Sequence, residues 1–159
     1  KIKGRNVLFI VNASNRYTLA MTDIEPRNWN YYTMYIRSVI HGVMQEMGYS
    51  EDQIGQYFKM SGDTTVTKTH GRKSVGGINR MVMDAQYFGK KLEKEAKYQW
   101  ELSKYLNRDI CQPEGFDAYG YPSELFKLDM ERLGIAAKRE PAKVIDFAQY
   151  IENNCGTND

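Results

Sequence analysis

The sequence predicts a small α+β domain: an antiparallel hairpin extended by a threonine-rich strand, packed by helices, with a helical C-terminal extension. An apolar run at residues 6–12 is followed, after a polar turn, by an alternating segment at 16–24. Several later stretches carry apolar residues at helical spacing. The length of 159 residues is typical of one domain and is sufficient to bury a core.

The composition is that of a globular chain, with 42% hydrophobic and 26% charged residues. The net charge of +2 argues against a general nucleic-acid binder, so any basic surface must be local. The two cysteines and two histidines show no zinc-binding spacing, and we predict neither a metal nor a cofactor. No apolar run approaches the ~20 residues that span a membrane, and no signal peptide is visible. We therefore expect a cytoplasmic protein.

The two N-terminal segments predict the hairpin. Residues 6–12 (NVLFIVN) read as a buried strand, and residues 16–24 (RYTLAMTDI) alternate well enough to pair with it. An isolated hairpin is only marginally stable, so a third strand is expected. The β-branched stretch that begins at Thr64 could supply it. A segment ahead of Lys1 could also do so, because the chain starts without a methionine.

Two helices are predicted between the hairpin and this stretch. Residues 27–47 carry a broad apolar stripe and end at Gly48, and His41 beside the stripe is interpreted as structural. Ser50 and Gln53 have the spacing of a capping box that opens a short helix to about residue 60. A further helix is predicted after Ser74, with a pattern that continues past Gly89 to residue 108. A rod of that length exceeds a compact domain, so we expect a kink near Gly89 or a partner for the second half.

The C-terminal part begins with a loop rich in glycine, proline and aromatic residues at 110–122. We expect Phe116, Tyr119 and Tyr121 to dock on a surface. Helices are predicted over 123–133 and 141–153. The proposed organisation is a core domain at 1–109 and a helical extension at 110–159 packed on it. A helix-turn-helix reading of the last two helices is disfavoured, because the second has few side chains that read base edges.

The most unusual chemistry lies in the strand-turn-helix at residues 67–80, TKTHGRKSVGGINR. Its basic residues surround a predicted helix start capped by Ser74, although a helix dipole favours anions there. A bound phosphate, carboxylate or nucleic-acid backbone would resolve that conflict. The two adjacent glycines would suit the close approach of a ligand or another backbone. The predicted anion-binding residues are Lys68, His70, Arg72, Lys73, Ser74, Asn79 and Arg80.

A structural reading of the same stretch stays open, because basic residues at a surface turn are often only solvated. The stretch is neither a Walker A loop nor a Rossmann fingerprint. We assign no catalytic residue and no metal ligand.

The stretch at 67–80 resembles the motif T-K-T-H-x-R-x-x-x-G-x-x-N-R of a bacterial domain family of unknown function, which is associated with phages and plasmids. NVLFIVN followed by RYTL resembles the strand pair of the same family. The resemblance covers about residues 4–92 and implies an intracellular bacterial α+β domain with sequence ahead of the hairpin. It implies no particular activity.

Three functions remain open at this point. The favoured one is a module that binds an anion or nucleic acid through residues 67–80. The second is a protein-interaction role, as an accessory or anti-defence protein of a mobile element, through the loop 116–121 and the C-terminal helices. The third is a phosphodiester-cleaving enzyme with His70 as the acid or base, for which no partner base is evident. The oligomeric state is not predicted.

Overall fold

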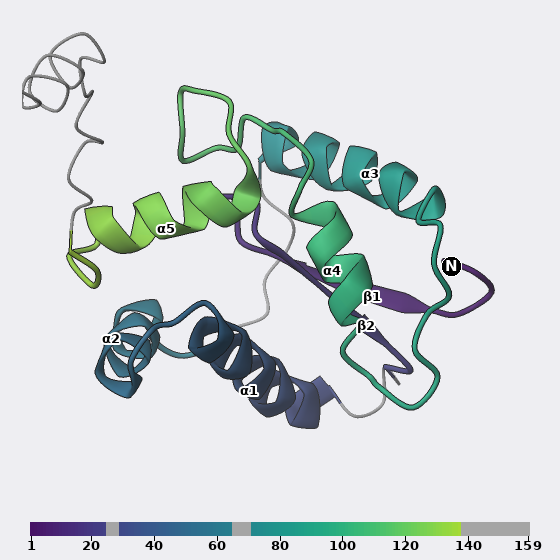
Figure 1. Ribbon diagram of the computed structural model, residues 1–159, viewed down its shortest axis with the longest axis horizontal. Helices are drawn as coiled ribbons and strands as arrows, with labels where there is room; N and C mark the ends of the chain where they lie inside the picture. The colour runs from purple at the N-terminus through teal and green to yellow at the C-terminus, as the bar shows by residue number, and fades with distance from the viewer. Residues whose placement is uncertain (25–28, 65–70, 138–159) are drawn as a thin grey trace, which may run out of the picture.

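The structure is a computed structural model that describes residues 1–24, 29–64 and 71–137. In these residues it contains a two-stranded antiparallel sheet and five helices, which confirms the α+β class (Figure 1). The predicted threonine-rich strand and the predicted helix at 141–153 lie outside the described residues. The elements are β1 (Val7–Val11), β2 (Thr18–Thr22), α1 (Trp29–Glu46), α2 (Glu51–Ser61), α3 (Arg72–Gln86), α4 (Trp100–Leu106) and α5 (Pro122–Arg132).

The hairpin lies between two helical layers, with α1 on one side and α3 on the other (Figure 1). Val7 pairs with Thr22 and Val11 with Thr18, so alternate residues face opposite layers. Phe9 packs with the core that includes α3 and α4, whereas Ile10 packs with the core that includes α1. This alternation buries both faces of the hairpin.

Backbone groups from the loop before α4 pair with the outer edge of β2. The Thr22 N–H donates to the Lys97 carbonyl at 2.8 Å, and the Gln99 N–H donates to the Ala20 carbonyl at 2.8 Å. These two bonds form a single antiparallel bridge rather than a full strand.

Ser103 of α4 and Asn107, the C-cap residue of this helix, complete that edge. The Ser103 Oγ accepts from the Ala20 N–H at 2.9 Å. The Asn107 side chain accepts from the Thr18 N–H and donates to the Thr18 carbonyl, both at 2.8 Å. The hydrogen-bonding role expected of a third strand is therefore filled in part by serine and asparagine side chains on a helix.

The prediction of helix through residue 108 is wrong. Helix α3 ends at Gln86, and the stretch between α3 and α4 is irregular. Gln99 organises this loop: its buried side chain donates to the carbonyls of Glu93 and Ala96 and accepts from the Glu93 N–H. Burial of Leu92 in the core requires no helix there, so the apolar periodicity was misleading.

Two local predictions for the region of α1 and α2 agree with the structure. Ser50 and Gln53 form the predicted capping box at the start of α2. The His41 Nε2 lies 2.9 Å from a Glu51 carboxylate oxygen, as a structural histidine would. Hydrogen bonds from His41 and then Gln45 hold the pKa of Glu51 below its usual range.

The described part of the C-terminal extension packs on the core through α5. Phe126 and Met130 are buried with Met44 of α1 and Ile54 of α2. In the preceding loop, Phe116 lies against the Arg132 guanidinium, whose carbon is 4.3 Å from the ring centroid. Tyr119 and Tyr121 stay 70% and 50% exposed, so the expectation that they dock is not met. Among the described helices, none has the length and apolar character needed to cross a membrane.

Candidate functional site

The hairpin turn between β1 and β2 is fixed by its own side chains. The Asn12 Oδ1 accepts from the Ser14 N–H at 2.9 Å, and the Asn15 Oδ1 accepts from the Tyr17 N–H at 2.9 Å. Asn15 is buried and donates to an Asp129 carboxylate oxygen of α5 at 2.8 Å. Short polar side chains of this kind stabilise turns by bonding to nearby backbone amides.

Arg16 lies near the end of this turn, and its backbone conformation is strained. Its φ of 68° lies in the left-handed region, which non-glycine residues rarely adopt. Its N–H donates to the Asn12 carbonyl at 2.9 Å, and its own carbonyl accepts from the Thr18 hydroxyl at 2.9 Å. The turn therefore holds the Arg16 backbone firmly and directs its side chain towards α3.

The Arg16 guanidinium lies directly on Gly77 of α3. A Cβ placed on Gly77 would overlap the guanidinium, whereas a Cβ on Gly76 would meet nothing within 4 Å. The two adjacent glycines therefore differ in their roles. Gly77 makes room for a close approach, but the group that approaches is an arginine side chain rather than the ligand or backbone that was expected.

The Arg16 guanidinium is also unsatisfied. Its Nη1 is inaccessible to solvent and has no hydrogen-bond partner, and no ion pair to Arg16 exists among the described residues. A buried polar group without a partner typically costs about 1–3 kcal/mol, and more when it is charged. Such a group in a native fold calls for an explanation, and an unbound anionic ligand is a physical one.

A polar cavity of about 360 Å³ lies beside this guanidinium. It is bounded by the hairpin, by α3 from Gly77 to Tyr87, by the end of α4 and by the loop that follows α4. This volume is within the range of small-molecule sites. Its polar and charged side chains are Arg16, Thr18, Arg80, Asp84, Tyr87, Tyr105, Asp109 and Cys111.

The charges around the cavity are mixed. The Arg80 Nε lies 4.0 Å from an Asp84 carboxylate oxygen, and the Arg80 side chain is 87% exposed, so it remains free to move towards a ligand. Burial raises the pKa of the Cys111 thiol, with the nearby Arg16 acting in the opposite direction and Asp109 raising it further. Cys111 is therefore a protonated thiol at neutral pH.

The start of α3 differs from the prediction. The helix begins at Arg72 with Gly71 as its N-cap, so Ser74 lies inside the first turn and is not the cap. The Ser74 hydroxyl donates to the Glu114 carboxylate, and a Cβ on Gly71 would lie 3.5 Å from the same carboxylate. The chain thus places its own anion at this helix N-terminus, where the dipole favours one. The Lys73 ammonium donates to the Pro113 carbonyl at 3.3 Å.

The predicted anion-binding residues do not all meet at one place. Lys68 and His70 lie outside the described residues. Arg80 lines the polar cavity, whereas Lys73 and Ser74 line a smaller cavity of about 50 Å³ on the other side of Arg16. Arg72 and Asn79 are exposed, and neither is among the residues that line these two cavities.

Arg16 was not predicted as a candidate site residue. One signal was available in the sequence: a basic residue at the end of a polar turn before a buried strand. Its contact with Gly77 spans the hairpin and α3 and leaves no local pattern. Among residues 1–24, 29–64 and 71–137, no group of three or more histidine, cysteine, aspartate or glutamate side chains is arranged to hold a metal ion.

The fold and site define a small α+β hairpin domain with an arginine-lined polar cavity. The chain belongs to the family described as a domain of unknown function, DUF6933, which it matches over residues 1–125. The match extends beyond residue 92, where the resemblance seen in the sequence ends, and includes α4 and the start of α5. No curated protein and no solved structure matches the chain significantly.

Proposed function

We propose that this chain is a binding module for a phosphate-bearing ligand and that Arg16 is the anchor for the phosphate. The observation that carries the proposal is that Arg16 lines a 360 Å³ polar cavity while its buried Nη1 has no partner among the described residues. A guanidinium matches phosphate geometry and forms charge-assisted hydrogen bonds with it. Arg80 would supply a second positive charge from the rim.

The cavity also suggests how the rest of the ligand is held. Asp84 and Asp109 would repel a long polyanion that lay across the rim, but they accept hydrogen bonds from hydroxyl or amino groups. Exposed Tyr87 and half-buried Tyr105 offer rings for stacking. These features favour a discrete phosphorylated molecule or the end of a nucleic-acid strand over the middle of a duplex.

The test is a comparison of small phosphates with nucleic acids. Pyrophosphate and mononucleotides would be titrated by calorimetry, and labelled single- and double-stranded oligonucleotides by fluorescence anisotropy over a salt series. Binding of at least one class is expected to weaken tenfold or more in Arg16→Met, since a hydrogen bond to a charged group contributes roughly 1.5–3 kcal/mol. Lys59→Met on α2 is the matched control, because it removes one exposed positive charge away from the cavity.

A second pair of substitutions separates the cavity from the surface turn. Arg72→Met with Lys73→Met removes the two described basic residues at the start of α3. Under the proposal this double variant retains most of the binding. Loss of binding in the double variant, with Arg16→Met unaffected, would contradict Arg16 as the anchor and return the site to residues 67–80. Binding by none of these proteins would remove the phosphate hypothesis.

Protein interaction through the loop 116–121 is the alternative, and one observation favours it. A backbone β-bridge between Cys111 and Gly120 closes the loop, and Tyr119 and Tyr121 are exposed on it. Exposed tyrosines on an ordered loop are typical of interfaces. Self-association is the form that can be tested without a known partner: sedimentation should show concentration-dependent association that is lost in Tyr119→Ser/Tyr121→Ser.

A further inference from the structure

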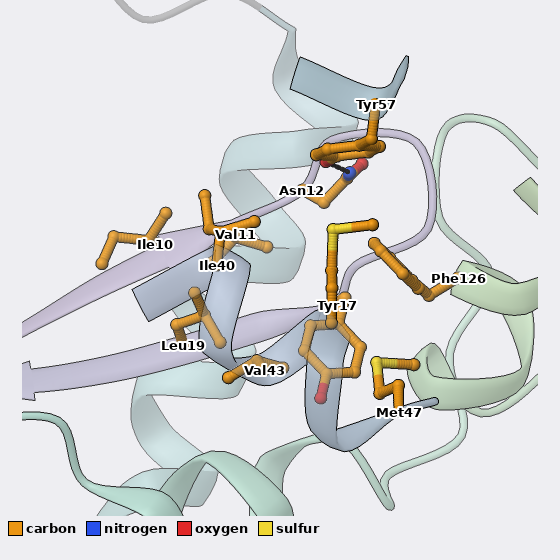
Figure 2. Close-up of a pocket in the computed structure, with 11 residues that line it drawn as sticks. Ile10, Val11, Asn12, Tyr17, Leu19, Ile40, Val43, Met47, Tyr57 and Phe126 are labelled. Atoms are coloured by element: carbon orange, nitrogen blue, oxygen red, sulfur yellow. Dashed lines mark hydrogen bonds between the residues drawn. The ribbon is translucent and has the colours of Figure 1, made fainter. Parts of the chain in front are cut away.

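A second cavity, separate from the polar one, lies between the hairpin, α1, α2 and α5 (Figure 2). Its volume is about 130 Å³. Most of its wall is aliphatic or aromatic, and only Asn12, Tyr17 and Tyr57 bring polar atoms to it. An engineered apolar cavity of similar size, about 150 Å³, binds benzene.

The walls of this cavity come from well-packed elements. The ring centroids of Tyr17 and Tyr57 lie 5.2 Å and 6.0 Å from that of Phe126, so three aromatic rings from different segments define one side. Leu19 of β2 and Val43 of α1 are buried on the other side. Most of the other lining residues are only partly buried, so the cavity is partly open and a small molecule can enter it.

One polar group in the cavity has a free hydrogen. The Asn12 Nδ2 donates to the Tyr57 hydroxyl oxygen at 3.4 Å, and the Asn12 Oδ1 is already bonded to the Ser14 amide, which fixes the orientation of the carboxamide. The Tyr57 oxygen is therefore the acceptor in that bond. Its own O–H donates to no acceptor among the described residues. Figure 2 shows this pair at the edge of the space that the apolar side chains enclose.

We propose that this cavity is a binding site for a small, mostly apolar molecule with one hydrogen-bond acceptor, which the Tyr57 hydroxyl recognises. The aliphatic and aromatic walls hold the body of the molecule, and Tyr57 sets its orientation. A polar or charged molecule is disfavoured, because no charged side chain lines the cavity. The proposal is independent of phosphate binding at Arg16.

The test uses two probes of nearly the same shape, anisole and ethylbenzene, which differ in one ether oxygen. Each is titrated into the full chain while the methyl signals of Leu19, Ile40 and Val43 are followed by NMR. Both probes should cause saturable shifts of these signals. Anisole should bind about five times more tightly, which is the effect expected of one neutral hydrogen bond.

Two variants make the result decisive. Tyr57→Phe keeps the ring but lacks the hydroxyl, so it should bind ethylbenzene as before and lose the preference for anisole. Val43→Phe should fill the cavity and abolish both sets of shifts, with circular dichroism as the check on folding. If Val43→Phe does not fold, Tyr57→Phe still decides the outcome. The absence of saturable shifts up to the solubility limit, or an anisole preference that survives in Tyr57→Phe, would overturn the proposal.

Discussion

Arg16 combines two features that oppose stability in the ligand-free protein. Its backbone is held at a positive φ, and its guanidinium lies against Gly77 with no acceptor for Nη1 among the described residues. Each feature costs free energy in the absence of a ligand. Residues that are strained or unsatisfied in this way tend to belong to functional sites.

The first prediction is that Arg16→Met has opposite effects on stability and on binding. Methionine keeps the aliphatic stem but removes the buried charge, so the ligand-free protein should become more stable by about 1 kcal/mol. Phosphate binding should be lost at the same time. Urea unfolding followed by fluorescence measures the first effect. Marked destabilisation by Arg16→Met would show that the guanidinium stabilises the ligand-free fold, and it would contradict a role in ligand binding alone.

The two glycines of α3 give a matched pair of substitutions. Gly76→Ala should stabilise the protein by roughly 0.5–1 kcal/mol, because alanine favours the helix and its Cβ meets nothing. Gly77→Ala should displace the Arg16 guanidinium, since the two would overlap. The far end of an arginine can move, so little stability should be lost, whereas phosphate affinity should fall. Equal phosphate affinities for the two variants would argue against the position of Arg16.

We predict that the Tyr17 hydroxyl makes the folding stability depend on pH in the alkaline range. Burial, with a smaller contribution from Glu46, raises its pKa from 10.0 to about 12. Between those values only the unfolded chain releases the proton, so the stability contributed by the neutral form is intact below pH 10 and is lost as the pH rises to about 12. The slope is at most ~1.4 kcal/mol per pH unit.

The corresponding measurement is urea unfolding of wild type and Tyr17→Phe at pH 8 and pH 11. Tyr17→Phe should lose less stability between these two conditions than wild type does. Tyr31→Phe, at an exposed position, serves as the control and should behave as wild type. An identical pH dependence of the unfolding free energy in Tyr17→Phe and wild type would contradict the claim that Tyr17 causes this loss of stability.

At the scale of elements, the edge of β2 shows how a two-stranded sheet becomes part of a stable core. All five residues of β2 are buried, so the outward amide and carbonyl groups of this strand have no access to water. The loop before α4 and the side chains of α4 satisfy them. A helix whose polar side chains bond to a strand edge replaces a neighbouring strand here, and it blocks pairing with another chain.

Ser103→Ala tests this arrangement. It removes the acceptor for the buried Ala20 N–H and should lower the free energy of unfolding by about 1–3 kcal/mol. Ser38→Ala is the matched control: Ser38 lies on α1, is exposed, and donates its hydroxyl to the Tyr35 carbonyl of its own helix. Thermal unfolding would compare the two. A Ser103→Ala protein as stable as Ser38→Ala would mean that the Ala20 amide finds another partner.

The elements that the sequence predicted correctly are those with local signals. The hairpin follows from two apolar runs around a polar turn, and the start of α2 follows from Ser50 and Gln53. The helix expected through Gly89 failed because Leu92 and Trp100 keep helical spacing although a loop separates α3 from α4. Side-chain hydrogen bonds from Gln99 to the backbone of residues 93–96 hold that loop, and such bonds leave no periodic pattern in the sequence.

For the molecule as a whole, anion binding stays a prediction, and the structure separates the residues that the sequence placed in one site. From residues 67–80, Gly77 and Arg80 line the polar cavity. The proposed anchor is Arg16, which is 61 residues earlier than Gly77 and reaches α3 only because the hairpin folds against it. We predicted an anionic ligand at the N-terminus of α3. The Glu114 carboxylate lies there instead, and it comes from the loop before α5, far away in the sequence.

The hairpin turn contacts several elements that are far apart in the sequence. In Figure 1 the turn end of the hairpin, the start of α3 and the start of α5 gather at one end of the sheet. Asn15 ties the turn to α5 through Asp129, Ser14 accepts from the Gly115 amide, and Arg16 reaches α3. The neighbouring Tyr17 lines the apolar cavity. One short turn thus contributes to both proposed sites.

The most direct test is to observe the Arg16 side chain itself during a titration. The arginine Nε–H signals of the ¹⁵N-labelled protein would be recorded with increasing pyrophosphate, and Arg16→Met would identify the Arg16 signal. We predict that the Arg16 signal shifts and saturates, with a smaller change at Arg80. An unchanged Arg16 signal, while that of Arg72 shifts or while no arginine responds, would contradict the assignment of Arg16 as the anion anchor.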